Sequence, residues 1–324
     1  MFKNQKEVKL PNRCTSLTFN KSIDQFVVSD GNIIKVYNNS ELSSQNPDYK
    51  QKIILSNDVI CMKYNNEGSL LAVSDLDYRL NVFDTENFYS EYSKFNKEVL
   101  KIWNLDFSPN NKEIATGAYS LMIFDVKTKE RIHDINNENN YIYSLCYLDN
   151  QKIATGNANG LISVYDVEKN KRLARLEGII YFILFHKFIY CLTEINIDHC
   201  LRVRSLKFDA QSNFLFSASD DLHINIIDPK TFKVVQPLVG HKDCITNIAF
   251  NNFYQIFSTC SLDGVIKFWD LRNNSGKCIQ TIETLDGSII WDSEFSPDGK
   301  HLIAGAFKFL FFTFLIILLI IYRY

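Results

Sequence analysis

Apolar segments that end on a polar residue recur along the chain at nearly regular intervals. Six of them are Val36-Tyr37-Asn38, Val82-Phe83-Asp84, Ile123-Phe124-Asp125, Val164-Tyr165-Asp166, Ile226-Ile227-Asp228 and Phe268-Trp269-Asp270. The central residues of consecutive segments lie 46, 41, 41, 62 and 42 positions apart. Four of these steps are close to about 40–45 residues, the length of a small antiparallel sheet in a ring-shaped repeat protein. Because such a sheet cannot bury its own faces, the pattern predicts a closed ring of sheets.

A second series marks the start of each repeat with an apolar strand that ends in an aromatic residue. Its members are Phe19, Tyr64, Phe107, Tyr147, Phe208, Phe250 and Phe295. The pattern resembles WD40 repeats and predicts an all-β, seven-bladed WD40 β-propeller over residues 1–306. The sequence contains seven opening aromatic residues but only six of the strand endings described above, so the seventh blade is expected to be incomplete.

An apolar insert, residues 179–200, accounts for the long step of 62 residues between blades four and five. Its core, residues 179–190, is too short for a good membrane span and is interrupted by His186 and Lys187. Exposed on a surface loop, it would form an apolar patch of a kind that soluble proteins avoid. We interpret the insert as translated intron sequence in an AT-rich gene.

A hydrophobic tail, residues 307–324, replaces the third strand expected in blade seven. Its apolar stretch of 14 residues, Phe309 to Tyr322, would make about 21 Å of helix, against a bilayer core of roughly 30 Å. The same intron origin explains it, and a membrane tail anchor is the alternative; no membrane partner is expected.

The ring is expected to close through the N-terminal segment, with residues 2–10 supplying the outer strand of blade seven. The third strand of that blade is then missing, and an unpaired edge favours aggregation. A second possibility is that residues 309–314 fill the vacancy as a strand.

Composition and motifs argue against several classes of function. The net charge is −2 and basic residues do not cluster, so no direct binding of nucleic acid is expected. The eight cysteines form no CxxC pair and are interpreted as reduced core thiols of an intracellular protein. The N-terminus lacks the apolar run of a signal peptide. No phosphate loop, dinucleotide fingerprint or metal-spaced set is present, so we expect no enzyme, no cofactor and no metal.

Blade six carries the most regular repeat. By position His241, Ser261, Asp263 and Trp269 resemble the structural hydrogen-bond set of WD40 repeats. A buried indole N–H and a buried imidazole both need such partners. A catalytic Ser-His-Asp trio is the alternative, but these residues belong to the framework of the repeat and no oxyanion-hole turn is visible.

Trp269 to Arg272 also matches the WDxR pattern of propellers that act as substrate receptors of cullin ubiquitin ligases. The alternative to this reading is a surface arginine that follows a strand.

By analogy with WD40 propellers, the residue four positions before each opening aromatic lies at the mouth of the ring. These residues are Thr15, Ile60, Trp103, Tyr143, Arg204, Thr246 and Trp291. Trp103, Tyr143, Arg204 and Trp291 have the composition of interface hot spots and are the predicted partner-binding rim. Packing of the inner strands is the alternative role.

Longer stretches resemble one WD40 family, the WD-repeat subunit of the superkiller (Ski) complex. They are residues 103–109 with 114–117, residues 153–166, residues 173–178, and residues 204–208 with 217–221. The resemblance covers roughly residues 50–178 and 201–305, blade by blade. In that family a His directly follows the position of Gly178, so the insert falls at this junction.

The resemblance implies a non-enzymatic scaffold. Its family partners are the helical-repeat scaffold and helicase subunits of the cytoplasmic Ski complex, which feeds mRNA to the exosome for 3′-to-5′ decay. The family is also similar to a nuclear subunit of the polymerase-associated-factor transcription elongation complex. We therefore expect nuclear and cytoplasmic localisation; the alternative function is the cullin-ligase substrate receptor.

Overall fold

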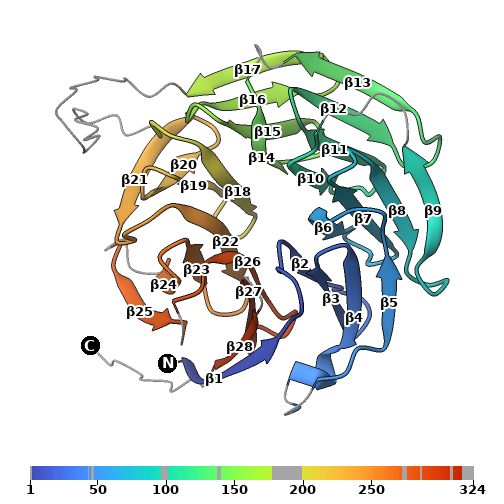
Figure 1. Ribbon diagram of the computed structural model, residues 1–324. Helices are drawn as coiled ribbons and strands as arrows, with labels where there is room; N and C mark the ends of the chain where they lie inside the picture. Colours follow the sequence, from blue (N-terminus) through green and yellow to red (C-terminus); the bar gives the residue numbers. More distant parts are fainter. Residues whose placement is uncertain are drawn as a thin grey trace.

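The computed structural model describes residues 2–42, 44, 47–95, 101–136, 140–176, 199–271, 276–284, 287–306 and 309–315. Within these residues the strands form seven four-stranded antiparallel sheets. The described residues also contain one short 3₁₀ helix, η1 (Asn39–Leu42). The sheets stand around a common centre like the blades of a propeller (Figure 1).

Six of the sheets are each built from four consecutive strands. Blade one contains β2 (Leu17–Phe19), β3 (Gln25–Asp30), β4 (Ile33–Asn38) and β5 (Gln51–Ile54). Blade two contains β6 (Val59–Tyr64), β7 (Leu70–Asp75), β8 (Leu80–Asp84) and β9 (Ser90–Phe95). Blade three contains β10 (Asn104–Phe107), β11 (Glu113–Gly117), β12 (Ser120–Asp125) and β13 (Arg131–Asn136).

The next three blades repeat this order. Blade four contains β14 (Ile142–Tyr147), β15 (Lys152–Asn157), β16 (Ile162–Asp166) and β17 (Lys171–Leu176). Blade five contains β18 (Val203–Asp209), β19 (Phe214–Ser219), β20 (His223–Asp228) and β21 (Lys233–Val239). Blade six contains β22 (Ile245–Asn251), β23 (Ile256–Ser261), β24 (Val265–Asp270) and β25 (Cys278–Glu283).

The seventh sheet joins the two ends of the chain. Its order is β26 (Ile290–Phe295), β27 (His301–Ala306), β28 (Phe309–Leu315) and β1 (Phe2–Lys9). Phe312 of β28 lies opposite Ile303 on one side and Lys6 on the other. The expectation of an incomplete seventh blade is therefore wrong, because tail residues 309–315 supply its third strand. Their backbone groups give both β27 and β1 a partner that an open edge would lack.

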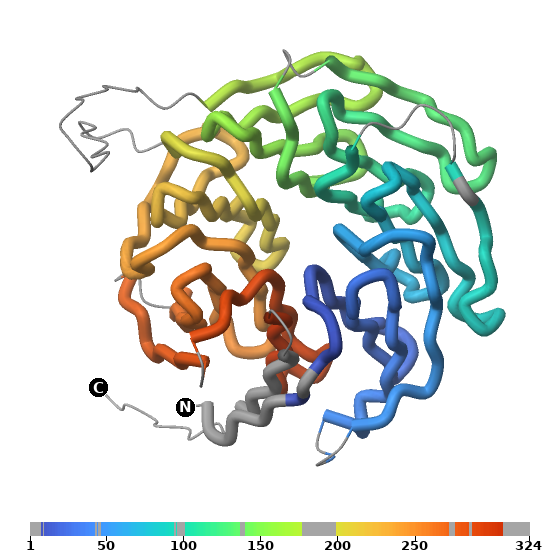
Figure 2. The backbone as a smooth tube through the Cα atoms, in the orientation of Figure 1, coloured from blue at the N-terminus to red at the C-terminus, as the bar shows by residue number. Residues whose placement is uncertain are grey.

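The first strand of every sheet faces the centre, and the fourth lies at the periphery (Figures 1 and 2). The second strands are buried on both faces, as the fully buried patterns of β3 and β23 show, and the third strands are mostly buried, fully so in β16. Their small or β-branched residues fit between neighbouring sheets. This arrangement leaves the first strands to form the wall of a central channel.

Hydrophobic side chains of adjacent sheets pack together in the space between them. One cluster contains Phe216 of blade five with Ile248, Phe257 and Trp269 of blade six. Phe257 is 1% exposed, and its ring lies 5.2 Å from that of Phe216. Truncating such a side chain to alanine costs about 3–5 kcal/mol, so the inter-sheet clusters hold the ring together.

The predicted insert, residues 179–200, lies largely outside the described residues, which end at Leu176 and resume at His199. In the part of the chain that the structure describes, no helix has the length and apolar character needed to cross a membrane.

Candidate interface at the channel mouth

A β-bulge interrupts the first strand of five sheets at equivalent positions. The pairing with the second strand shifts between Val59 and Cys61, Ile142 and Ser144, Val203 and Ser205, Ile245 and Asn247, and Ile290 and Asp292. The extra residue at each shift is Ile60, Tyr143, Arg204, Thr246 or Trp291. A bulge re-aims a side chain away from the regular alternation of a strand. The five bulged residues all belong to the predicted set of mouth residues.

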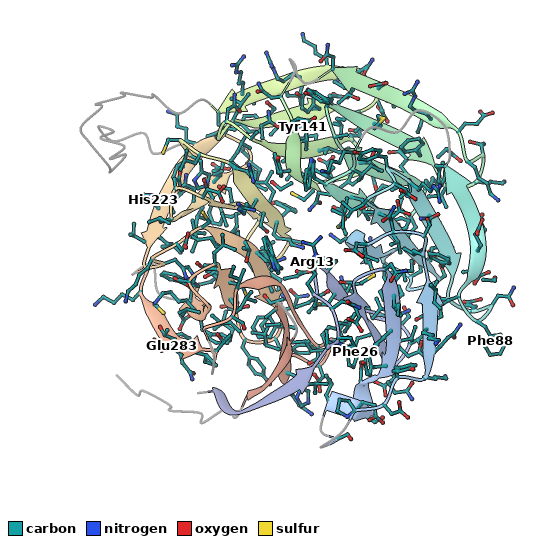
Figure 3. The ribbon with its side chains drawn as sticks, in the orientation of Figure 1. Arg13, Phe26, Phe88, Tyr141, His223 and Glu283 are labelled. Atoms are coloured by element: carbon teal, nitrogen blue, oxygen red, sulfur yellow. The ribbon has the colours of Figure 1, made fainter. Side chains whose placement is uncertain are left out.

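The two other members of that set lie just before their strands: Thr15 is two residues before β2, and Trp103 is one residue before β10. All seven line one cavity of about 870 Å³ at the centre of the ring. The structure therefore brings Trp103, Tyr143, Arg204 and Trp291 together around a single opening. Arg13, at the centre of Figure 3, lines the same cavity.

Two of the mouth residues tie adjacent sheets together. Thr15 Oγ1 donates a hydrogen bond to the carbonyl of Val59 at 2.7 Å, and Thr246 Oγ1 donates to the carbonyl of Ile290 at 2.7 Å. Each bond crosses from one blade to the next. The alternative role, inner-strand packing, therefore describes these two threonines well.

Aromatic and cationic side chains form a continuous row across blades three, four and five, here called the stacking row: Lys101, Trp103, Tyr143 and Arg202. Lys101 Nζ lies 4.4 Å from the centre of the Trp103 ring. The Trp103 and Tyr143 rings are stacked, with centres 4.9 Å apart and planes 30° apart. Arg202 Cζ lies 4.2 Å from the centre of the Tyr143 ring. Such cation–π contacts hold flat groups in place.

Sequence reasoning missed Lys101, which lies three residues before β10, and Arg202, which lies one residue before β18. The only sequence signal for Arg202 is that it stands two positions before Arg204, with Val203 buried between them.

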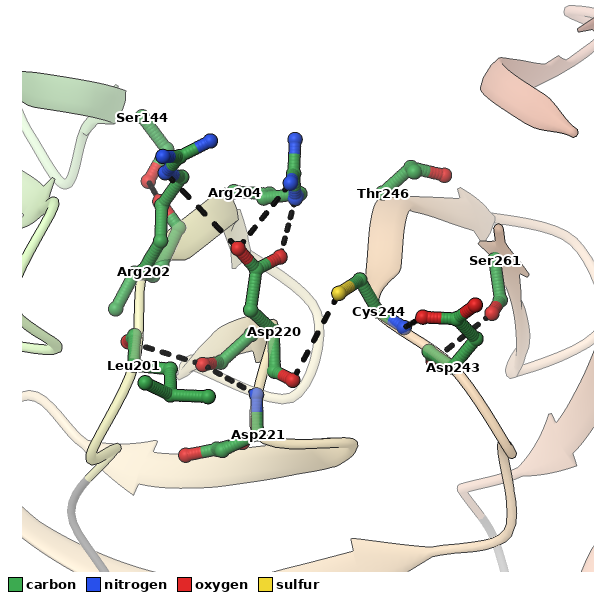
Figure 4. Close-up of polar contacts among 12 residues, drawn as sticks. Ser144, Leu201, Arg202, Arg204, Asp220, Asp221, Asp243, Cys244, Thr246 and Ser261 are labelled. Carbon is green, nitrogen blue, oxygen red and sulfur yellow. Dashed lines mark hydrogen bonds and ion pairs between the residues drawn. The ribbon is translucent and has the colours of Figure 1, made fainter. Parts of the chain in front are cut away.

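Arg202 and Arg204 share the carboxylate of Asp220 (Figure 4). Arg204 donates from Nε to Asp220 Oδ1 and from Nη2 to Oδ2, the latter at 3.1 Å, as a two-pronged pair. Arg202 Nε is 3.9 Å from Oδ2. One carboxylate thus faces two guanidinium groups, which leaves this part of the mouth with an excess of positive charge.

On the other side of the channel, Asp292 connects three blades. Its Oδ2 accepts from the Leu17 N–H at 2.9 Å, and its Oδ1 accepts from Asn247 Nδ2 at 2.6 Å. These partners belong to blades one and six, while Asp292 belongs to the closing sheet. Burial raises the pKa of Asp292 to about 6, although the Leu17 N–H and the charge of Lys207 act in the opposite direction.

Deeper in the channel, Lys63 Nζ lies 2.8 Å from Asp106 Oδ1. Burial opposes the charge of Lys63, but Asp106 stabilises it and the pKa of the lysine is raised. The pair joins β6 to β10, so it also connects neighbouring blades.

The predicted hydrogen-bond set of blade six is present with one correction. His241 Nδ1 lies 3.1 Å from Asp263 Oδ2, and His241 Nε2 lies 2.8 Å from Thr259 Oγ1. Trp269 Nε1 donates to the same Thr259 oxygen at 2.9 Å. Thr259, not Ser261, is therefore the hydroxyl between histidine and tryptophan.

Ser261 Oγ instead donates to the Asp243 carbonyl at 2.9 Å and accepts from the Asp263 N–H at 3.1 Å. It shapes the turn that presents Asp263. Thr259 and Ser261 lie two residues apart on the same face of β23, so sequence alone did not distinguish them.

Blade five contains a second such set that sequence reasoning missed. His199 Nδ1 lies 2.9 Å from Asp221 Oδ2, and His199 Nε2 lies 2.7 Å from Ser217 Oγ. The prediction assigned His199 to the insert. Its contacts place it instead in the repeat, as the counterpart of His241.

The His199 set has the donor order of a hydrolytic triad, yet its environment does not suit catalysis. Ser217 is fully buried and His199 is 1% exposed, so a substrate has no route to the hydroxyl. The equivalent position in blade six holds Thr259 in a purely structural chain. Both sets therefore stabilise their blades.

The cysteine thiols offer little reactivity. Burial raises the pKa of Cys260 to about 12 and that of Cys61 to about 11, so both are neutral near pH 7. Over the residues that the structure describes, no cluster of three or more His, Cys, Asp or Glu side chains is suited to a metal ion. Trp269 of the WDxR pattern is buried, and Arg272 lies outside the described residues.

A family model described as WD domain, G-beta repeat matches residues 187–228 and 232–270. These ranges contain both histidine sets, the four strands of blade five and the first three strands of blade six. The chain thus contains WD40 repeats, within a propeller of seven sheets. WD40 domains generally serve as non-enzymatic scaffolds for protein interaction.

Curated relatives of this propeller are also WD40-repeat proteins. It is 29% identical over 183 residues to WD repeat-containing protein SL1-17 of Schistosoma mansoni, which covers 55% of this chain and 53% of that protein. It is 25% identical over 288 residues to the DDB1- and CUL4-associated factor 11 homolog of Caenorhabditis elegans, covering 79% of this chain and 47% of that protein.

A third similar protein is the U3 small nucleolar RNA-associated protein 21 homolog of Schizosaccharomyces pombe, 27% identical over 153 residues, which are 47% of this chain and 14% of that protein. The chain thus spans about half the length of the first relative, 53%, and less of this one.

Proposed function

We propose that this WD40 propeller is a non-enzymatic scaffold that binds segments of partner proteins at its channel mouth. The observation that carries the proposal is the stacking row, which presents Trp103, Tyr143 and Arg202 side by side on three blades. Trp, Tyr and Arg are the residue types enriched in interface hot spots. Trp103 and Tyr143 are half-buried, so their rings are held in place and still reach the opening.

The partners we propose are the helical-repeat scaffold and helicase subunits of the Ski complex, and subunits of the polymerase-associated-factor elongation complex. The support is the sequence resemblance described above, blade by blade over residues 50–178 and 201–305. On this proposal the protein acts in exosome-linked mRNA decay and in transcription elongation, and resides in both nucleus and cytoplasm.

Affinity purification with quantitative mass spectrometry tests the proposal. The variants are Trp103→Ala and Tyr143→Ala, and the matched control is Phe88→Ala, an 81% exposed aromatic at the periphery of the ring (Figure 3). We expect the first two to lose the helical-repeat and helicase subunits and the control to retain them. Thermal melting checks that each variant is folded. Full retention of those subunits by a folded Trp103→Ala variant overturns the role of the mouth.

A second candidate function is that of a substrate receptor in a cullin ubiquitin ligase. Two observations favour it: the WDxR pattern at residues 269–272, and the similarity to proteins named DDB1- and CUL4-associated factors 11 and 10. Arg272→Ala is then expected to lose the cullin adaptor in the same purification, while Trp103→Ala retains it. Recovery of helicase subunits without the adaptor from the unmodified protein rejects this second function.

A further inference from the structure

The cavity of this propeller carries more positive than negative charge. Six basic side chains line it: Arg13, Lys21, Lys63, Arg202, Arg204 and Lys207. Two acidic side chains do so, Asp292 and Glu294. Three more carboxylates, Asp58, Asp106 and Asp220, pair from outside the lining with Arg13, Lys63 and Arg204, so the excess is one positive charge. The whole chain has a net charge of −2, so the wall of the channel is charged opposite to the chain as a whole. A channel with one sign of charge in excess attracts groups of the other sign.

The excess is greatest in the part of the mouth formed by blade five. Asp220 is shared by two arginines, and its side chain is 14% exposed while that of Arg202 is 35% exposed. Arg204 takes both Asp220 oxygens at hydrogen-bond distance, whereas Arg202 reaches only 3.9 Å. The Nε of Arg202 is buried and has no hydrogen-bond partner in the described part of the chain, so an incoming carboxylate would meet the terminal nitrogens of its guanidinium group. Arg202 therefore retains capacity for a second carboxylate.

Apolar and planar surface lies directly beside this charge. Tyr143 holds Arg202 on one face and stacks on Trp103, and Lys101 lies over the Trp103 ring. The stacking row thus has an aromatic centre and a cation at each end. The faces of both rings are covered by one another and by the two cations, so an aromatic side chain of a ligand can meet the ring edges while acidic groups pair with the cations.

We propose that the occupant of the channel mouth is an acidic peptide segment with one aromatic side chain. Its aromatic ring lies against Trp103 and Tyr143, and its carboxylates pair with Arg202 and Lys101. The proposal rests on the proposed scaffold function and adds the chemistry of the partner.

Single-stranded nucleic acid also combines planar and anionic groups, but the peptide fits better. Nucleic acid adds one negative charge with each nucleotide, and its binding needs clustered basic residues. Here Asp292 and Glu294 stand in the same cavity, and the chain as a whole is acidic. A short segment with a few carboxylates avoids that repulsion.

Fluorescence anisotropy with three labelled peptides of equal length tests the proposal on the full chain. The first peptide contains four Asp or Glu residues around one Phe in a Gly-Ser background. The second replaces each acid by its amide, and the third replaces Phe by Ser. We expect the first to bind about tenfold more tightly than either of the others, with an affinity that falls as salt rises.

Two matched variants locate the site. Arg202→Gln is expected to weaken the acidic peptide about tenfold and to leave the amide peptide unchanged. Lys169→Gln removes the same charge from a side chain that is 73% exposed in the turn between β16 and β17 of blade four. It is expected to leave the affinity for both peptides unchanged. Thermal melting confirms the fold of both, and Arg202→Lys provides a second variant that keeps the charge without the planar stack and binds at an intermediate level.

The outcomes separate this proposal from the proposed function. Equal binding of acidic and amide peptides, or no loss with folded Arg202→Gln, overturns the acidic preference, as does tighter binding of a labelled oligothymidine. If Trp103→Ala still loses the natural partners in the purification, the scaffold function stands without the acidic preference. If Trp103→Ala keeps those partners, the scaffold function at the mouth is overturned, whatever the peptides show.

Discussion

His199 lies 22 residues before Asp221 and contacts it through Nδ1 at 2.9 Å, in the same relation that His241 has to Asp263. The second contact also repeats, because His199 reaches Ser217 and His241 reaches Thr259, each 18 residues along. Two consecutive blades therefore contain the same buried polar chain. In the tautomer with its proton on Nδ1, the imidazole donates to the ionised carboxylate and Nε2 accepts from the hydroxyl.

The hydroxyl of Thr259 is expected to be the critical group of the blade-six chain. Thr259→Val removes the partner of both His241 and Trp269 and leaves two buried polar groups unpaired, which costs about 2–4 kcal/mol of unfolding free energy. Thr259→Ser keeps the hydroxyl and loses under about 1.5 kcal/mol. Urea denaturation measures both, and equal losses for the two variants contradict the chain.

Acid is expected to destabilise the protein partly through Asp263. Burial opposes its charge, but the hydrogen bond to His241 and the Lys242 N–H lower its pKa to about 2. The lowered pKa of Asp263 contributes stability at pH values above about 4, the ordinary pKa of an aspartate. That contribution is lost as the pH falls towards 2. Because solvent screens a partly exposed pair, Asp263→Asn should be about 1 kcal/mol less stable than the unmodified protein near neutral pH and should approach it in acid. Acid titration followed by circular dichroism measures the difference, and a constant gap at all pH values contradicts the assignment.

The repeat pattern predicted the ring, and analogy with WD40 propellers predicted the set of residues at its mouth. It placed Trp103, Tyr143, Arg204 and Trp291 at equivalent positions, and the structure brings them to one cavity. The reason that Tyr143, Arg204 and Trp291 reach it, a bulge at the same point of the first strand, depends on pairing register. Register also decided between Thr259 and Ser261. Arg202 was not predicted because its role depends on stacking against Tyr143 from another blade.

Asp292 is expected to give the opposite pH dependence to Asp263. Its pKa is raised to about 6 by burial, so its contribution to stability is present below about pH 4 and is lost as pH rises through 6. Asp292→Asn removes that dependence, and the stability of the variant relative to the unmodified protein should rise between about pH 4 and about pH 7. Urea denaturation across this range checks the slope. Parallel pH profiles of the two proteins would show that Asp292 titrates normally.

Removal of β28 is expected to open the ring. A chain that stops at Ala306 leaves β27 and β1 without the strand that pairs with both. A chain that stops at Leu315 keeps all seven sheets and serves as the control. Size-exclusion chromatography and thermal melting should show aggregation or a melting temperature lower by at least about 10 °C for the shorter chain alone. Identical melting of the two chains would mean that β28 contributes nothing to closure.

The segment between Gly178 and His199 is expected to be dispensable for the fold. Blade six begins with Gly240 directly followed by His241, and the equivalent pair in blade five is separated by residues 179–198. Deleting 179–198 joins Gly178 to His199 and restores the spacing of the repeat while keeping the His199 contacts to Asp221 and Ser217. We expect this deletion to melt at or above the temperature of the full chain. The control deletion, 179–200, also removes His199 and leaves Ser217 and Asp221 without it, so it should melt several degrees lower, by about 4–8 °C. If both deletions melt alike, His199 is not the first framework residue of blade five; if deletion of 179–198 unfolds the protein, that segment is part of the ring.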